Sequence, residues 1–103
     1  MKSEVLKSVL IDELERNKRF ISRYEAEIAG LPKGSVFCRT IGSQQYYYLS
    51  FREGSKVMSK FLGKEGAFDV EALQGQLASR KELNLLLKKL KSEQKELEKA
   101  LGK

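Results

Sequence analysis

Apolar positions recur with the period of an α-helix at both ends of the chain. The first stripe advances in steps of three, four or seven residues through residues 3–29, and its members are Leu10, Leu14, Ile21, Tyr24 and Ile28. Asn17 occupies the one stripe position that is not apolar. Gly30 suits the left-handed position after a helix and Pro32 cannot continue one, so we expect the helix to end at residue 29.

A second helical pattern covers residues 69–101. Asp69 is a good N-cap for it, because its carboxylate can accept a hydrogen bond from a backbone amide of the first turn. The stripe alternates three- and four-residue steps if Gln94 is counted as a polar member, and its apolar members are Leu83, Leu87, Leu90, Leu97 and Leu101. Such a stripe needs a partner helix. The first helix is the nearest candidate, and a middle segment that returns the chain would make the two antiparallel.

Both helices carry more apolar side chains than one narrow seam can use, and the additional ones are Val5, Val9, Ile11, Leu85 and Leu86. We therefore expect a homodimer, most simply a four-helix arrangement with two-fold symmetry. The alternative is that the middle segment folds back and covers the excess. The residues expected to pack the helices or the dimer are Leu10, Leu14, Ile21, Leu83, Leu86, Leu87, Leu90 and Leu97.

Between the helices lie three short runs with strand character, at residues 36–41, 46–52 and 56–62, each bounded by glycine-containing turns. They predict a three-stranded antiparallel meander within residues 36–62. The predicted fold class is therefore α+β, with two long antiparallel, coiled-coil-like helices joined by a small sheet. With 103 residues, the chain is expected to form a single domain spanning residues 1–103.

The length of the second turn decides which side chains share a face of this sheet. A three-residue loop around Gly54 would gather one apolar face, made of Tyr47, Leu49, Phe51, Val57 and Phe61. The opposite face would then hold Tyr46, Tyr48, Ser50, Lys56, Met58 and Lys60. A two-residue loop would set Leu49 opposite Lys60 and mix the two faces, so the longer loop is favoured.

Charge adds a candidate function to the second of these faces. The chain has a formal net charge of +6, and residues 33–66 hold six basic and only two acidic residues. Lysine and arginine can displace counterions from phosphates, and tyrosine can stack on an unpaired base. The candidate nucleic-acid-binding residues are Arg39, Tyr46, Tyr48, Arg52, Lys56 and Lys60. The competing interpretation is a solvated sheet face, where tyrosine and lysine are common in any protein.

The second helix carries a basic stripe of its own, because Lys81, Lys88 and Lys95 recur every seven residues. Lys91 and Lys99 lie nearby, and the glutamates of residues 93–98 are interleaved with them. This pattern favours a solvated stripe over a binding groove.

The middle segment resembles a family of small uncharacterised bacterial proteins. The likeness rests on LPKGS at residues 31–35, YYYL at 46–49, REG at 52–54, KV at 56–57 and SKFLGK at 59–64, followed by a charged leucine-rich helix. Longer members of that family place a cysteine cluster in the first hairpin; this chain has only Cys38, so the resemblance implies no metal site. The hairpin is also similar, more loosely, to the three-stranded sheets with which some phage-type integrases grip DNA. That likeness implies DNA contact and no catalytic residues.

Several function classes are disfavoured by composition. With no histidine and one cysteine, the chain lacks the usual ligand sets for zinc, haem and iron–sulfur clusters, and we expect no cofactor. Residues 63–66 lack the spacing and the hydroxyl residue of a phosphate-binding loop, and we expect neither a small-molecule substrate nor an enzyme. The apolar runs are too short for a membrane span, and the charged start does not resemble a signal peptide, so a cytoplasmic location is expected.

Two function hypotheses therefore remain. In the first, the chain is a non-catalytic nucleic-acid-binding accessory factor that uses the basic and aromatic face of the sheet. In the second, it is a coiled-coil interaction or scaffold module that binds no nucleic acid.

Overall fold

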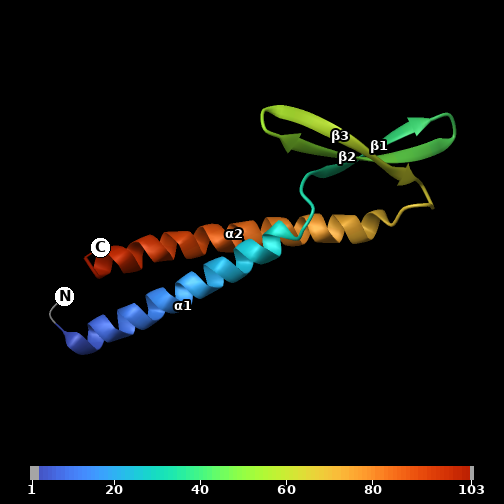
Figure 1. The fold of residues 1–103 in the computed structure, drawn as a ribbon. Helices are drawn as coiled ribbons and strands as arrows, with labels where there is room; N and C mark the ends of the chain where they lie inside the picture. The colour runs from blue at the N-terminus through green and yellow to red at the C-terminus, as the bar shows by residue number, and fades with distance from the viewer. Residues whose placement is uncertain (1–2, 103) are drawn as a thin grey trace. The chain divides into compact units, whose positions relative to one another are not determined.

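A computed structural model describes residues 3–102 of the chain. In chain order its elements are α1 (Glu4–Ala29), β1 (Ser35–Ile41), β2 (Gln44–Glu53), β3 (Lys56–Lys64) and α2 (Val70–Ala100), drawn in Figure 1. Two helices thus flank a three-stranded antiparallel sheet, and the predicted α+β fold class is confirmed. The helix ends lie within one residue of the predicted ones.

The chain divides into two compact units. One contains α1 together with the part of α2 that follows Arg80, and we call it the helical hairpin. The other runs from Leu31 to Arg80 and contains the sheet and the first turns of α2; we call it the sheet unit. Cooperative unfolding of the two as a single domain stays a prediction.

In the helical hairpin, α1 and the second part of α2 run antiparallel. The first turn of α1 is capped by Ser3, whose hydroxyl accepts a hydrogen bond from the Leu6 amide at 3.2 Å. Between the helices, the Asn17 side-chain amide donates to the Leu90 carbonyl oxygen at 2.9 Å. The start of α1 and the end of α2 lie at the same end of this hairpin (Figure 1).

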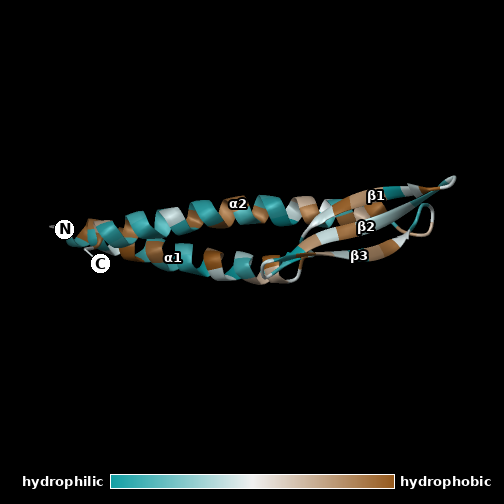
Figure 2. Cartoon of the chain, turned by 90° about the horizontal axis from the view of Figure 1, so that it is seen from above, coloured by the Kyte–Doolittle hydropathy of each residue, from teal (hydrophilic) through white to brown (hydrophobic). Residues whose placement is uncertain are grey.

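The predicted stripe of α1 is buried. Its buried members follow the expected spacing and are Leu14, Asn17, Ile21 and Ile28, while Leu10 and Tyr24 are half-buried. The matching positions of α2 are less well covered: Leu83, Leu87, Leu90, Gln94 and Leu97 are all half-buried. Figure 2 shows hydrophobic segments recurring along both helices on otherwise hydrophilic ribbons. The packing side of each helix was therefore predictable, and the depth of burial is modest.

The sheet unit has strand order β1-β2-β3. The first pairing runs without interruption from Ser35 opposite Ser50 to Ile41 opposite Gln44. The second pairing starts with Glu53 opposite Lys56, so only Gly54 and Ser55 lie between the strands. A register shift next to Tyr47 and Tyr48 leaves one extra residue in β3. The helix that follows is capped by Asp69, whose carboxylate accepts from the Ala72 amide at 3.1 Å, as expected.

The end of α1 differs from the expectation. Gly30 has φ −85° and ψ −5°, an ordinary right-handed conformation, so the predicted left-handed C′ glycine is wrong. The Gly30 amide donates to the Glu27 carbonyl at 3.2 Å, which closes the last turn with a tighter three-residue bond. The left-handed conformation falls four residues later, at Gly34, where φ is 119°.

Gly34 is where the connection from α1 meets the sheet. A Cβ atom at this position would collide with the Ser50 carbonyl oxygen and would lie 3.1 Å from the Phe51 Cβ. Only glycine combines this φ with so close an approach of two backbones. The glycine of the LPKGS segment therefore has a packing reason as well as a turn reason.

We expect Gly34→Ala to lower the free energy of unfolding by on the order of 2–3 kcal/mol, because it adds both backbone strain and a collision. Gly42→Ala is the matched control: φ there is 64°, also left-handed, but a Cβ would meet nothing within 4 Å. Its cost should be about 1 kcal/mol, from backbone strain alone. Urea unfolding followed by circular dichroism measures both, and equal costs would show that the predicted collision is absent.

Candidate nucleic-acid interface

The two-residue turn at Gly54 and Ser55 fixes the faces of the sheet, and it is the turn that the sequence analysis disfavoured. Leu49 lies opposite Lys60, Phe51 opposite Met58 and Tyr48 opposite Phe61. Directly paired residues share a face, so the side chains of residues 56–61 lie on the side opposite to the predicted one. Val57 and Phe61 therefore share the face of Tyr46 and Tyr48, and the predicted apolar face containing them is wrong.

The revised face joins aromatic rings to cations, and we call it the aromatic face. Its members, by cross-strand pairing and ring contacts, are Phe37, Arg39, Tyr46, Tyr48, Arg52, Phe61 and Lys64. Tyr48 lies at the centre of the cluster. The Phe37 ring stacks on it at 5.2 Å between centroids, and the Phe61 ring is tilted against it at 5.5 Å. The Tyr46 and Phe61 centroids are 6.3 Å apart.

Two of the three cations of the aromatic face, Arg39 and Lys64, are neighbours of its rings. The Arg39 guanidinium carbon is 5.5 Å from the centroid of the Tyr48 ring, a cation–π contact. Lys64 is the direct cross-strand neighbour of Tyr46, and Arg52 pairs with Val57. Among the paired strand positions on this face there is no aspartate or glutamate, so its formal charge is entirely positive.

The aromatic face is open. Phe61 is 56% exposed and Val57 is 66% exposed, although both are large apolar side chains. Phe37, Tyr46 and Tyr48 are half-buried by their neighbours in the cluster. A ring at the surface of a positively charged sheet can accept a base or a sugar without first displacing a packed side chain.

The opposite face of the sheet has different chemistry. Val36, Leu49 and Phe51 lie there, and Gly34 packs against Leu49 and Phe51. The space beside Gly63, where a Cβ would lie, is closed by Phe68 at 3.0 Å. The segments that enter and leave the sheet therefore lie against this face at these two glycines.

Four of the six candidate binding residues are brought together on the aromatic face, namely Arg39, Tyr46, Tyr48 and Arg52. Lys56 and Lys60 lie on the opposite face, where Lys56 faces Glu53 across the turn. Phe37, Phe61 and Lys64 were missed. The Gly-Ser pair could have placed Phe61, because a two-residue hairpin turn with glycine at a left-handed position (Gly54, φ 64°) is a common hairpin connection. Phe37 lies on β1, and Lys64 follows the register shift next to Tyr47 and Tyr48, so neither position follows from that turn alone.

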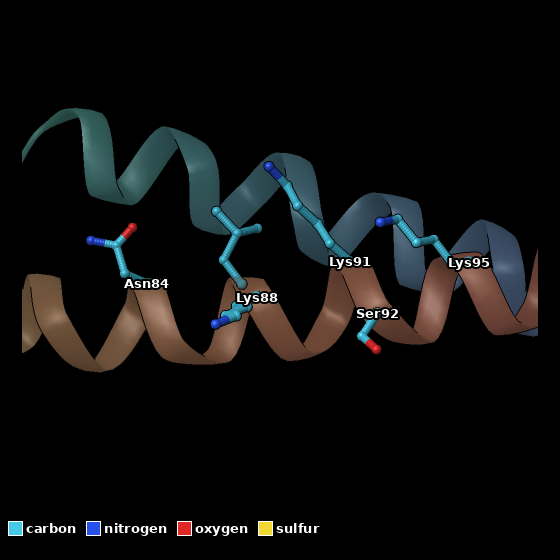
Figure 3. Close-up of a pocket in the computed structure, with 6 residues that line it drawn as sticks. Asn84, Lys88, Lys91, Ser92 and Lys95 are labelled. Atoms are coloured by element: carbon cyan, nitrogen blue, oxygen red, sulfur yellow. The ribbon is translucent and has the colours of Figure 1, made fainter.

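A second basic surface lies on the helical hairpin. An open groove of about 430 Å³ along α2 is lined by Asn84, Leu87, Lys88, Lys91, Ser92 and Lys95 (Figure 3). Lys91 and Lys95 extend toward α1 in this view, and the Lys91 ammonium lies 3.6 Å from the Glu25 carboxylate. This groove contains part of the predicted lysine stripe. Glu93 of the interleaved glutamates lines a different groove, described below.

No site for a metal ion was found: in residues 3–102, no three histidine, cysteine, aspartate or glutamate side chains lie close enough to hold one. Among the described helices, none is both long and apolar enough to cross a membrane.

These elements define a small α+β protein in which a helical hairpin and a three-stranded sheet with an open aromatic face are built from one chain. The chain belongs to the family described as a domain of unknown function, DUF6788, whose members it matches over residues 10–72. The match spans most of α1, the whole sheet and the start of α2. Neither a curated protein nor a solved structure matches the chain.

The strand register can be tested by double-mutant cycles on ring pairs. Tyr48→Ala and Phe61→Ala should show a coupling of about 0.5–1.5 kcal/mol, because the two rings are in contact. Tyr47 and Phe61 lie on opposite faces, so the same cycle on that pair should give a coupling within about 0.3 kcal/mol of zero. Urea unfolding supplies both. Coupling in the Tyr47 pair and none in the Tyr48 pair would instead support the three-residue turn.

Proposed function

We propose that the protein binds nucleic acid through the aromatic face of its sheet, as a non-catalytic accessory factor. The observation that carries this proposal is that Arg39, Arg52 and Lys64 share a sheet face with a ring cluster whose Phe61 is exposed, and that the paired positions of this face carry no acidic side chain. Cations supply contacts to phosphates, and rings supply contacts to bases or sugars.

Charge separation between the two faces supports the choice of surface. On the opposite face, Lys56 and Lys60 are accompanied by Glu53, which lies directly across from Lys56. A phosphate there would meet a carboxylate, whereas a phosphate on the aromatic face would meet cations alone. The aromatic face is therefore the better anion surface, although the sequence assigned the two lysines to it.

The arrangement of the rings also supports nucleic acid over a smaller anion. Phe37, Tyr48 and Phe61 come from three different strands and meet in one cluster. Such a cluster is larger than an isolated phosphate ion can use, but it matches the size of a sugar and a base. The likeness of this hairpin to the DNA-gripping sheets of phage-type integrases agrees with this assignment.

The proposed role is binding without a reaction. The chain has no histidine, and the paired positions of the aromatic face carry no carboxylate for acid–base chemistry. The proposed setting is the cytoplasm, where nucleic acid is accessible and the exposed thiol of Cys38 stays reduced.

The test compares two charge-reversal variants of equal charge change. Arg39→Glu/Arg52→Glu removes cations from the aromatic face, and Lys56→Glu/Lys60→Glu makes the same change on the opposite face. We expect the first to weaken binding by roughly tenfold or more and to lower the slope of log affinity against log salt by about 1.5–2. The second should change affinity by about threefold or less, through long-range charge alone.

Fluorescence anisotropy with labelled single-stranded DNA, duplex DNA of the same sequence and single-stranded RNA measures these affinities. Circular dichroism of each variant checks that the sheet is still folded. Equal weakening by the two variants would remove the aromatic face as the binding surface, and no binding by the unmodified protein at low salt would remove the function itself.

A second candidate function, an interaction module built on the helices, is favoured by a separate observation. Val5, Leu6 and Val9 are 74%, 58% and 52% exposed on α1, and Leu85 is 71% exposed on α2. Side chains of this kind in contact with water favour association with another apolar surface. The flank of the hairpin that contains Leu6 and Val9 is considered next.

A further inference from the structure

The helical hairpin has two unlike flanks. One flank carries a polar stripe along α2, part of which lines the groove in Figure 3. Its members follow one another in steps of three and four residues and are Lys81, Asn84, Lys88, Lys91 and Lys95. Ile11 and Lys18 of α1 belong to this lysine flank, because they precede Glu25 by fourteen and seven residues and Glu25 contacts Lys91. Five lysines and one glutamate, Glu25, are thus named on this flank, so a second copy placed against it would bring together two surfaces of the same net sign.

The other flank contains a groove of about 230 Å³ between the helices. Its α1 side is formed by Glu13, Arg16, Asn17 and Phe20, and its α2 side by Leu90, Glu93 and Leu97. The helical spacing extends this surface to Leu6, Val9 and Tyr24 on α1 and to Leu86 on α2. We call this surface the apolar flank.

The apolar flank exposes large side chains that a monomer leaves in water. Leu6 is 58% exposed, Val9 is 52% exposed and Leu86 is 38% exposed, while Phe20 and Tyr24 are half-buried. Each apolar side chain fully removed from water contributes about 1.5–3 kcal/mol to association or folding. The flank is therefore a surface whose burial would be favourable.

Asn17 lies buried behind the groove of this flank and joins the two helices of one chain. The residue is only 5% exposed, and its amide nitrogen donates to the Leu90 carbonyl oxygen. Its side-chain oxygen is buried and has no hydrogen-bond partner. A buried acceptor without a donor costs about 1–3 kcal/mol, and a buried asparagine in a helix interface often serves to fix alignment.

The charges at the groove are of both signs, which is what a surface needs in order to bind itself. Glu13 and Glu93 line it together with Arg16. The Arg16 guanidinium lies 3.8 Å from Glu13 and 5.5 Å from the Phe20 ring centroid, and its side chain is 61% exposed. Because a two-fold axis places each surface against its own copy, an acid on one chain can then face the base on the other.

We propose that the apolar flank is the contact surface for a second copy of this chain, related by a two-fold axis that passes beside Asn17. In this dimer the exposed apolar side chains of the two flanks cover each other, and Arg16 of one copy can face Glu13 or Glu93 of the other. The lysine flanks of both copies then stay in contact with water. The proposal does not depend on nucleic-acid binding by the sheet.

The first test compares Leu86→Glu on the apolar flank with Ile11→Glu on the lysine flank. The two residues are a matched pair, since each is a 38% exposed apolar side chain on a helix and receives the same substitution. Sedimentation equilibrium of the full chain over a range of concentrations should give a dimer for the unmodified protein. Leu86→Glu should raise the dissociation constant by about 100-fold, and Ile11→Glu by about threefold or less.

A second test locates the axis by cross-linking. In a Cys38→Ser background, Arg16→Cys places a thiol beside the groove, and Lys88→Cys places one on the lysine flank. Mild oxidation should link the Arg16→Cys chains into covalent dimers and leave the Lys88→Cys chains largely unlinked. A monomer at every concentration, equal effects of the two glutamate variants, or preferential linking through Lys88→Cys would each overturn the proposal.

Discussion

The two-residue turn between Glu53 and Lys56 decides on which face of the sheet the side chains of residues 56–61 lie. Side chains alternate along a strand, so one more residue in that turn would move Phe61 away from Tyr48 and bring Lys60 beside it. Gly54 makes the short turn accessible by adopting φ 64° without steric cost. The composition of the candidate binding face thus depends on a backbone conformation several residues away from it.

The observed register brings together side chains that pair favourably on both faces, although it does not separate polar from apolar residues. Pairing Tyr48 with Phe61 gathers three rings on one face, and pairing Phe51 with Met58 keeps apolar contact on the other. The longer turn would give one wholly apolar face, but the connecting segments would have to cover all of it. In the structure, Gly34 meets the sheet at Leu49 and Phe51, and Phe68 meets it at Gly63. The face opposite to the aromatic face can therefore hold both apolar and charged side chains, because only its apolar side chains need to be covered by the connecting segments.

The helices of this chain follow from its sequence more closely than the faces of its sheet do, for physical reasons. The helices were predictable because the stripe through Leu14 and Ile21 is periodic over many turns. Their ends were predictable because Asp69 caps the start of α2 and Pro32 cannot continue α1. Even the polar position at Asn17 followed from the heptad spacing. The faces of β3 were not predictable from alternation alone, since alternation fixes which residues of one strand share a face but not how two strands are aligned. The alignment depends on turn geometry, which here is the two-residue turn with Gly54 at φ 64°.

The conformation of Gly30 was missed for a related reason. A glycine before Leu31 and Pro32 fits a left-handed helix end, but the helix can also close through the bond from the Gly30 amide to Glu27. The strained position is instead Gly34, where the chain must pass close to the backbone of Ser50. Sequence places a glycine at both positions and does not show which of them the tertiary approach requires.

Burial is the quantity that unites the two proposals. Among the described residues, the apolar side chains that count as buried are Leu14, Ile21, Ile28 and Leu77. Several large apolar side chains are largely exposed: Phe61 lies on the aromatic face of the sheet, and Leu6, Val9 and Leu86 lie on the apolar flank of the helices. Small domains gain little free energy from so limited a core, and association is one of the ways in which they add to it. The two surfaces differ in the occupant they favour: cations of a single sign around rings suit a polyanion, whereas apolar side chains with charges of both signs suit a second copy of the same surface.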